Sequence, residues 1–165
     1  LVWGKPLSRY PRLRSKVGVL LENDGLYENL TGAQNLEYYA SLYGVAGKEK
    51  RISSLLDFTG LAGRRNDKVG TYSRGMRRKL GLARAILHEP SVLLLDEPSS
   101  GLDPEVQRMV RDLILSLAKE QNMEIFLNSH DLDEVERICD RVVILQRGRV
   151  VACDSLNNQL CIFIN

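Results

Sequence analysis

The chain has 165 residues, of which 44% are hydrophobic and 27% are charged, which is ordinary for a soluble globular domain and argues against a disordered chain. Its 23 basic and 21 acidic residues nearly cancel, so the overall charge gives no sign of a nucleic-acid partner. No apolar run approaches the roughly 18 residues that span a bilayer, so we expect any contact with a membrane to be made from its surface.

The spacing of apolar and turn residues predicts one strand and three helices in the first part of the chain. Thr31 and Gln34 have the spacing of a capping box, so a helix should begin after Thr31 and end at Gly44. Another helix should begin after the cap residue Ser73 and stop before Pro90. The other segments are a strand over residues 16–21, a loop over 22–25, a helix over 48–58 and a polar loop over 63–71.

Strands and helices alternate in the second part of the chain. Residues 91–97 begin as an apolar strand, and Pro104, with Asp103 as its cap, opens a helix. The buried stripe of that helix is expected at Val106, Met109, Val110, Leu113 and Leu117. Further strands are expected over 124–128, 141–146 and 149–153, with a helix over 132–138. This order predicts an α/β fold with a parallel core sheet covered by helices, and a hairpin at its end.

Two adjacent carboxylates, Asp96 and Glu97, end the apolar strand. Ligands of open parallel sheets bind outside the carboxyl ends of the strands, which is where these charges should emerge. Side by side they repel each other unless a cation takes up the charge, and Mg²⁺ is typically held by one or two carboxylates together with phosphates. The alternative, a strand-end aspartate that caps the next turn, accounts for only one of the two.

Two further segments are candidates for the same edge. His130 follows the strand over 124–128, and Ser73 and Gly75 open a helix with a basic first turn. Free N–H groups and the positive end of the helix dipole suit a phosphate there. Each feature has an ordinary structural alternative, a packed histidine in one case and a capped basic helix in the other.

Together these segments resemble the nucleotide-binding subunit of ATP-binding cassette (ABC) transporters, in the order of that family. Residues 91–97 resemble the Walker B strand and its catalytic glutamate, 100–103 (SGLD) the D-loop, and His130 the switch histidine. YSRGM at 72–76 stands where the family has LSGGQ, and Glu22 stands where it usually has the glutamine of the Q-loop. The last two resemble the exporter-like subfamily that handles drugs, antibiotic peptides or lipids.

The resemblance implies a P-loop NTPase-like fold that hydrolyses ATP with Mg²⁺. We expect residues 1–24 and 89–165 to form the RecA-like core and approximately 25–88 the helical subdomain with the signature segment. Asp96 would hold Mg²⁺, Glu97 would polarise the attacking water and His130 would orient it. Glu22 would sense the metal and the membrane subunit.

The family's domains work as head-to-tail pairs, so the resemblance also implies partners. The signature residues Ser73, Arg74, Gly75 and Met76 would contact ATP held by a second nucleotide-binding domain, and Asp103 would bridge the pair. A membrane-spanning permease would dock on residues 25–71, placing the protein peripherally at the cytoplasmic face of the membrane, and no nucleic-acid partner is expected.

One family motif is absent from the sequence. The P-loop, G-x-x-x-x-G-K-[ST], should precede Lys16, and Gly4-Lys5-Pro6 has neither the earlier glycine nor the hydroxyl residue. We therefore expect a fragment of a longer domain that by itself binds ATP weakly and hydrolyses it negligibly. Two alternatives stay open: a non-catalytic interaction fragment, and an ATPase of DNA repair or chromosome organisation, against which the absence of a long coiled-coil insertion argues.

Tyrosines gather in the segment where the permease would dock. We expect Leu26 and Tyr27, which lie between a loop glycine and a helix cap, to be available to that partner. Tyr39 and Tyr43, at helical spacing, are expected to fill the core of the helical subdomain instead.

Overall fold

The computed structural model describes residues 4, 9–120, 123–147, 149–155 and 160–164. Its elements in chain order are α1 (Pro11–Arg14), β1 (Val17–Leu20), α2 (Gly32–Tyr43), α3 (Lys48–Phe58), the 3₁₀ turns η1 (Ala62–Arg64) and η2 (Val69–Thr71), α4 (Arg74–Ala85), β2 (Val92–Asp96), α5 (Pro104–Glu120), β3 (Glu124–Asn128), α6 (Leu132–Ile138), β4 (Arg141–Gln146), β5 (Arg149–Ser155) and β6 (Leu160–Ile164).

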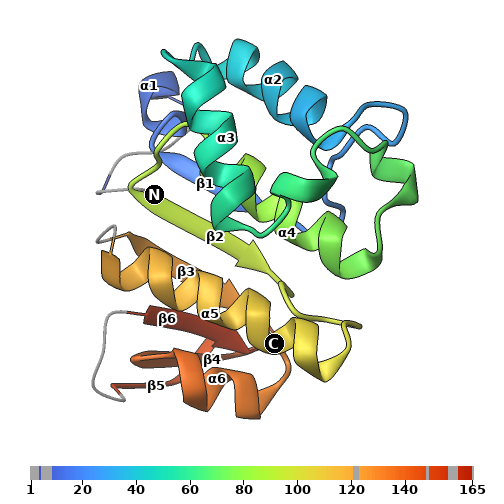
Figure 1. Cartoon of the computed structure of the whole chain (residues 1–165). Helices are drawn as coiled ribbons and strands as arrows, with labels where there is room; N and C mark the ends of the chain where they lie inside the picture. The colour runs from blue at the N-terminus through green and yellow to red at the C-terminus, as the bar shows by residue number, and fades with distance from the viewer. Residues whose placement is uncertain (1–3, 5–8, 121–122, 148, 156–159, 165) are drawn as a thin grey trace.

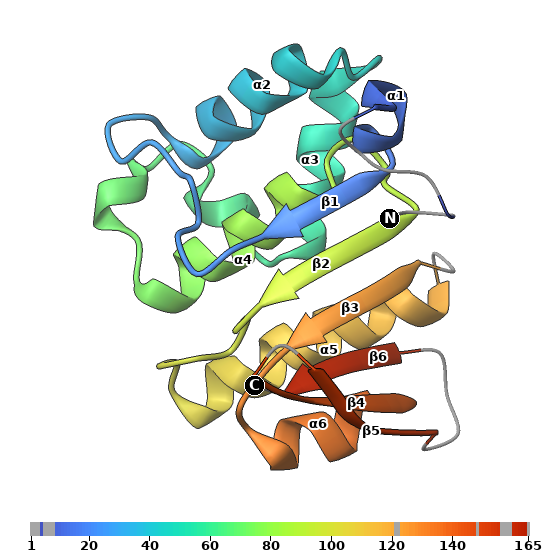
Figure 2. The same ribbon diagram turned by 180° about the vertical axis from the view of Figure 1, so that it is seen from behind.

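A six-stranded sheet in the order β1-β2-β3-β6-β4-β5 runs through the molecule. Its first five strands are parallel, and β5 pairs antiparallel with β4. Helices α5 and α6 lie in front of the sheet in Figure 1, and the view from behind shows the strands themselves facing the viewer (Figure 2). The predicted α/β fold with a parallel core sheet and a final hairpin is confirmed.

Helices α2, α3 and α4 gather beside the β1 end of the sheet (Figure 1). Helix α2 begins with the predicted capping box, in which Thr31 Oγ1 accepts from Gln34 N at 3.1 Å and Gln34 Oε1 accepts from Thr31 N at 2.9 Å. It ends at Gly44, whose φ of 66° is the left-handed conformation that a glycine adopts without strain. Local signals therefore position this helix as predicted.

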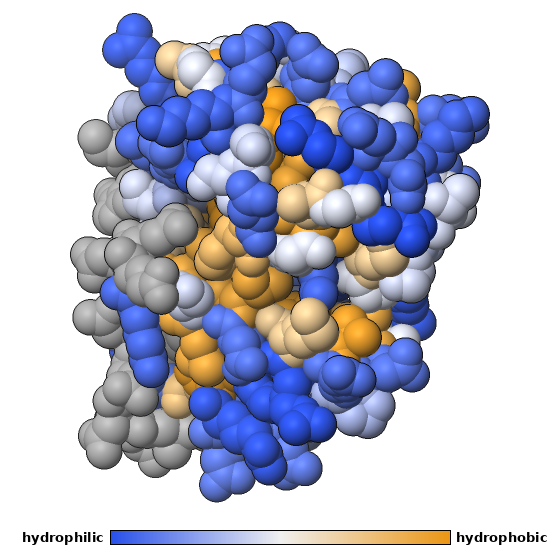
Figure 3. Space-filling model, in the orientation of Figure 1, coloured by the Kyte–Doolittle hydropathy of each residue, from blue (hydrophilic) through white to orange (hydrophobic). Residues whose placement is uncertain are grey.

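The core is continuous between the helical group and the sheet. Leu36, Leu56 and Leu80 of α2, α3 and α4 are fully or almost fully buried, as are Leu93 of β2 and Leu117 of α5. In the space-filling view apolar residues gather between α3 and α5, with polar residues above and below them (Figure 3). This shared core holds α4 and the strand ends of the sheet in fixed relation.

Three expectations about the elements were wrong. The segment 63–71 contains parts of two 3₁₀ turns instead of a plain loop, because Val69 is fully buried there. Met109 is 45% exposed and Ile114 is fully buried, so the stripe of α5 is rotated toward Val110, Ile114 and Leu117. Strand β6 was not predicted; it lies between β3 and β4 and pairs in parallel with both.

Candidate functional site

Asp96 and Glu97 lie at the carboxyl end of β2, beside the end of β3. Leu93 and Leu95 are buried on one face of the strand, and the chain emerges from the core at the half-buried Asp96. Asn128, the partner of Asp96 in the β2–β3 register, donates from Nδ2 to Asp96 Oδ1 at 2.8 Å. The parallel pairing of β2 with β3 therefore places the predicted site residue Asp96 beside Asn128.

Glu97 has an unusual backbone conformation. Its φ is 47°, in the left-handed region that residues with a side chain rarely adopt. Its N–H donates to Asn128 O at 2.9 Å, which holds the turn after β2 against the end of β3. Strained backbone of this kind persists only where the surroundings fix it, and it is frequent at active sites.

His130 meets the carboxylate of Glu97. The distance between His130 Nδ1 and Glu97 Oε1 is 2.7 Å, and the histidine side chain is 74% exposed whereas that of Glu97 is 24% exposed. The hydrogen bond with Glu97, reinforced by its negative charge, raises the pKa of His130. The structure thus brings together Asp96, Glu97 and His130, which are distant in the sequence, at one edge of the sheet.

A buried glutamate holds the turns that carry these residues. Glu134 of α6 accepts hydrogen bonds from Ser99, after β2, and from Ser129, after β3, the latter at 2.9 Å. Ser99, Ser129 and Glu134 are all buried. Asp131 caps α6 by accepting from the N–H groups of Asp133 and Glu134. The loop of His130 is therefore fixed from both sides.

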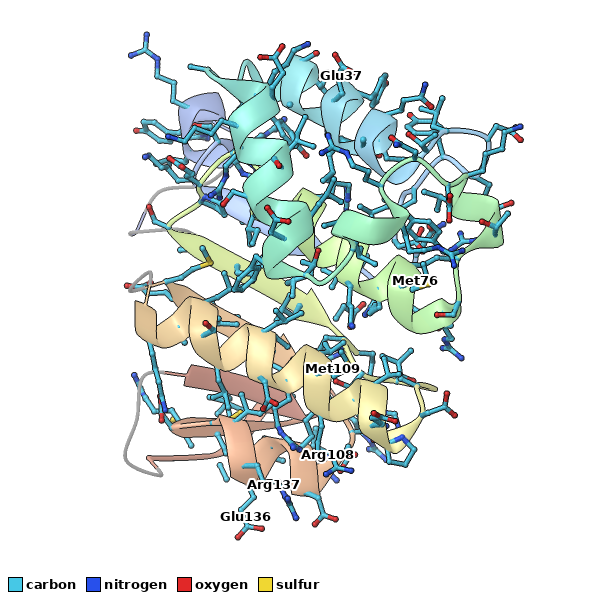
Figure 4. The ribbon with its side chains drawn as sticks, viewed as in Figure 1. Glu37, Met76, Arg108, Met109, Glu136 and Arg137 are labelled. Atoms are coloured by element: carbon cyan, nitrogen blue, oxygen red, sulfur yellow. The ribbon has the colours of Figure 1, made fainter. Side chains whose placement is uncertain are left out.

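The predicted signature segment opens α4 as expected. Ser73 Oγ accepts from Met76 N at 3.2 Å and so acts as the helix cap. Gly75 is buried, and a Cβ added there would overlap Val106 Cγ1 of α5. Figure 4 shows Met76 on α4 above Met109 on α5. The glycine thus has a packing role inside the chain, in addition to any role toward a ligand.

The loop after β1 closes the site from the other side. A cavity of about 100 Å³ is lined by Glu22, Asp24, Arg74, Arg77, Arg78, Glu97, Ser100 and Leu102. It joins three predicted site residues, Glu22, Arg74 and Glu97. Arg77 ties this loop to α4 by ion pairs with Asp24 at 3.1 Å and Glu28 at 2.6 Å.

The remaining predicted residues lie outside this cavity. Ser73, Gly75 and Met76 open α4 but do not line it, and Asp103 is exposed at the start of α5. The guanidinium of Arg74 lies so close to Gly101, whose φ is 65°, that a Cβ there would overlap it. The signature segment and the predicted D-loop are therefore in direct contact within one chain.

The donor set suits a divalent ion that shares its coordination with a bound phosphate. Within the part of the chain that the structure describes, no group of three or more histidine, cysteine, aspartate or glutamate side chains is arranged to hold a metal unaided. Mg²⁺ ordinarily takes only one or two protein carboxylates and completes its shell with water and phosphate oxygens. Asp96, with one oxygen accepting from Asn128, fits that requirement.

Three residues that shape the site were not singled out for these roles from the sequence. Asn128 and Glu134 lie near predicted site residues, but their partners belong to other elements. Arg78 belongs to the predicted basic helix turn, and its guanidinium reaches the backbone of two separate loops. A buried polar side chain of this kind has no local sequence signal, because only the fold shows that its position is buried.

The sequence profile of the family described as "ABC transporter" matches residues 1–100, which is more than half of the chain. The chain belongs to the ABC transporter family. An uncharacterised ABC transporter ATP-binding protein of Bacillus subtilis is 40% identical to it over 160 residues, which cover 96% of this chain and 52% of that protein. A fluoroquinolones export ATP-binding protein of Mycobacterium tuberculosis is 42% identical, over 93% of this chain and 50% of its own length.

Other family members agree in sequence and fold. The bacitracin transport ATP-binding protein of Bacillus licheniformis is 43% identical over 82% of this chain and 44% of that protein. A solved ATP-binding subunit of an ABC transporter superposes with a TM-score of 0.79 at 33% identity, covering 93% of this chain and 65% of that structure. A post-hydrolysis dimer of an ATP-binding cassette bound to ADP and Pi has a TM-score of 0.80 at 23% identity, over 94% and 69% of the two chains.

These matches confirm the predicted family and its ABC ATPase fold. The chain spans about half the length of the curated relatives that it matches. Among the described residues, no helix has both the length and the apolar character needed to cross a membrane.

Proposed function

We propose that this ABC family chain is part of the ATP-binding and hydrolysing subunit of a transporter. The observation that carries the proposal is the 2.7 Å contact of Glu97 with His130 beside Asp96, at the carboxyl ends of two parallel strands. Phosphoryl transfer needs a positioned water and stabilised charge more than it needs covalent chemistry, and these side chains supply both.

Each side chain at the edge takes a separate part in the proposed reaction. Glu97 accepts a hydrogen bond from the attacking water and polarises it, and the imidazole of His130 orients that water toward the γ-phosphate of ATP. Asp96 would hold Mg²⁺, and Glu22, on the facing loop, would lie near enough to sense it. When bound, the ion neutralises charge on the phosphate oxygens.

The signature residues serve a second nucleotide-binding domain in this proposal. Ser73, Arg74, Gly75 and Met76 begin α4, whose free N–H groups and positive dipole end suit the γ-phosphate of ATP held by that domain. Asp103 is exposed and free to contact it. Because Arg74 contacts Gly101, the signature segment and the predicted D-loop would move together when the second domain binds.

An exposed tyrosine cluster supports docking on a permease. Tyr27, Tyr38 and Tyr43 are 45%, 47% and 44% exposed, and the rings of Tyr27 and Tyr38 contact each other edge to face at 5.0 Å. Two expectations from the sequence were wrong here. Tyr43 was predicted to fill the core of the helical subdomain but is exposed, and Leu26 was predicted to be available to the permease but packs partly against the core. Large aromatic side chains of this kind are typical of interfaces.

Export at the cytoplasmic face of the membrane is the proposed setting. Relatives in the family are named for fluoroquinolone export and for bacitracin transport. The YSRGM segment at 72–76 and Glu22 also favour export, because both resemble the exporter-like subfamily. A role in DNA repair or chromosome organisation has no support from these relatives.

The division of the chain into a RecA-like core, residues 1–24 with 89–165, and a helical subdomain, approximately residues 25–88, also stays a proposal.

The 165-residue chain itself should bind ATP weakly, because its sequence contains no P-loop to supply most of the phosphate contacts. Calorimetry with Mg-ATP tests this together with the main proposal. We expect no measurable binding to the chain alone, and both binding and hydrolysis when a family P-loop segment is joined before Leu1. Micromolar affinity of the chain alone would contradict the first expectation, and an extended chain that binds ATP without hydrolysing it would contradict the proposed activity.

A further inference from the structure

Arg78 is a buried arginine whose partners are backbone carbonyl groups. It lies on the inner side of α4 and is 8% exposed. Its guanidinium donates from Nε to Pro98 O (2.8 Å), from Nη1 to Leu21 O (2.6 Å) and Glu22 O (3.4 Å), and from Nη2 to Asp96 O (2.5 Å) and Glu97 O (2.7 Å). All three nitrogen atoms are therefore engaged.

These carbonyl groups belong to two loops that leave the sheet side by side. One follows β1 and carries Glu22, and the other follows β2 and carries Glu97; Leu20 and Leu95 are register partners at their bases. A planar guanidinium donates in several fixed directions at once, which an ammonium group cannot do. Arg78 is thus one rigid connector among α4 and the two loops.

The loop after β2 needs such a connector because Glu97 has a positive φ. Asn128 O holds the Glu97 N–H on one side. Arg78 holds the carbonyl groups of Asp96, Glu97 and Pro98 on the other. Without the second set of bonds, the Glu97 backbone is free to relax toward an ordinary conformation and its carboxylate to leave His130.

We propose that Arg78 is a positioning residue that fixes the Glu97 carboxylate against His130 and couples its position to the Glu22 loop and to α4. The importance of this geometry for hydrolysis rests on the proposed function, but the geometry itself does not. If the signature end of α4 or the Glu22 loop moved, Arg78 would move with it and would shift the proposed catalytic residue Glu97.

Arg78→Lys and Arg78→Met test the proposal in the chain without nucleotide. We expect the Glu97 amide to exchange its hydrogen about tenfold faster or more in both variants, since each lost hydrogen bond is worth about one factor of ten. The core amides of β2 and β3 should keep their exchange rates. Arg51→Lys is the matched control, because the guanidinium of Arg51 also donates to two backbone carbonyl groups, Leu87 O at 3.3 Å and Ile86 O at 2.7 Å, which belong to neither of the two loops.

A nuclear magnetic resonance titration of His130 separates positioning from charge. Loss of a positive charge near His130 would by itself raise its pKa, whereas release of Glu97 would lower it toward the ordinary value of about 6.5. We expect a lower pKa of His130 in both Arg78 variants, including Arg78→Lys, which keeps the charge. The pKa of His130 should not change in Arg51→Lys. The other charged groups that face His130 are Asp131 and Glu134, and neither is changed.

Unchanged Glu97 exchange and an unchanged His130 pKa in a folded Arg78 variant would overturn the proposal, as would equal effects of Arg51→Lys. If neither Arg78 variant folds, hydrogen exchange of the arginine side chains in the unmodified chain tests the proposal instead. There the Arg78 Nε–H should exchange much more slowly than that of the exposed Arg74, and equal rates would refute the connector. None of these measurements involves ATP, so their failure is distinguishable from failure of the proposed hydrolysis.

Discussion

Gly75 in the signature segment offers a direct test of how α4 and α5 pack. A Cβ placed there would overlap Val106 Cγ1 and lie 3.5 Å from Val106 Cβ and Cγ2. Overpacking of this kind costs about 1–3 kcal/mol, whereas replacing glycine by alanine within a helix gains about 1 kcal/mol. Val106 is stiff because it is β-branched, so the clash should prevail and Gly75→Ala should destabilise the fold by about 1 kcal/mol.

The double variant Gly75→Ala/Val106→Ala removes the atoms that clash. In urea denaturation followed by circular dichroism, the alanine at position 75 should become stabilising in the Val106→Ala background. The coupling energy should be about 1–3 kcal/mol. Gly81→Ala is the control in the same helix, because its Cβ would meet the flexible end of Leu20, Cδ1, at 2.9 Å. Additive effects of the two substitutions would refute the packing role of Gly75.

Three further results are expected. Asn35 is fully buried and bonds the backbone of Tyr27 through both its oxygen (2.8 Å) and its nitrogen (3.0 Å), so Asn35→Ala should cost about 2–4 kcal/mol in urea denaturation; a cost below 1 kcal/mol would contradict this. The double variant Tyr27→Asp/Tyr38→Asp should remain folded but should no longer co-purify with a permease. The control Val150→Asp, at a residue that is 61% exposed on β5, should still co-purify. Co-purification of the double variant at the parental yield would disprove docking at the tyrosine cluster. The raised pKa of His130 means that its pairing stabilises the fold fully below about pH 6.5 and that this stabilisation is lost as pH rises through the folded-state pKa. Burial lowers the pKa of His88, so its effect is opposite: stability is lost as pH falls from about 6.5 through the lowered value. Titration of both histidines checks the signs, and Glu97→Gln should lower the pKa of His130 without changing that of His88.

Elements with local signals could be predicted from the sequence. The capping box at Thr31 and the αL glycine at Gly44 bound α2 as predicted, and the bounds of α3, β3 and α6 agree with the predicted ranges. Such signals depend on neighbours a few residues apart, which the sequence displays directly. The convergence of Asp96, Glu97 and His130 followed from the rule that parallel strands end at one edge.

Features that depend on distant partners could not be predicted in this way. Strand β6 pairs with β3 and β4, and its short apolar run has no alternation or hairpin turn to identify it. Arg78 bonds to Pro98, 20 residues away, and to Leu21, 57 residues away. Nothing in a basic helix turn indicates which arginine is buried. The resemblance to the family predicted which groups react, and the structure adds the side chains that hold these groups in place.

The steady-state ATPase rate of Glu97→Gln tests the central claim most directly. The measurement uses the chain joined to a family P-loop segment before Leu1, with ATP binding measured in parallel. Glu89→Gln is the matched control, because Glu89 also has a positive φ, of 54°, but its side chain is 76% exposed and away from the predicted site residues. We predict that Glu97→Gln binds ATP normally and hydrolyses it about 10²–10⁴-fold more slowly, with Glu89→Gln unchanged. A Glu97→Gln variant that turns over ATP at the parental rate would contradict the proposed catalytic role of this edge of the sheet.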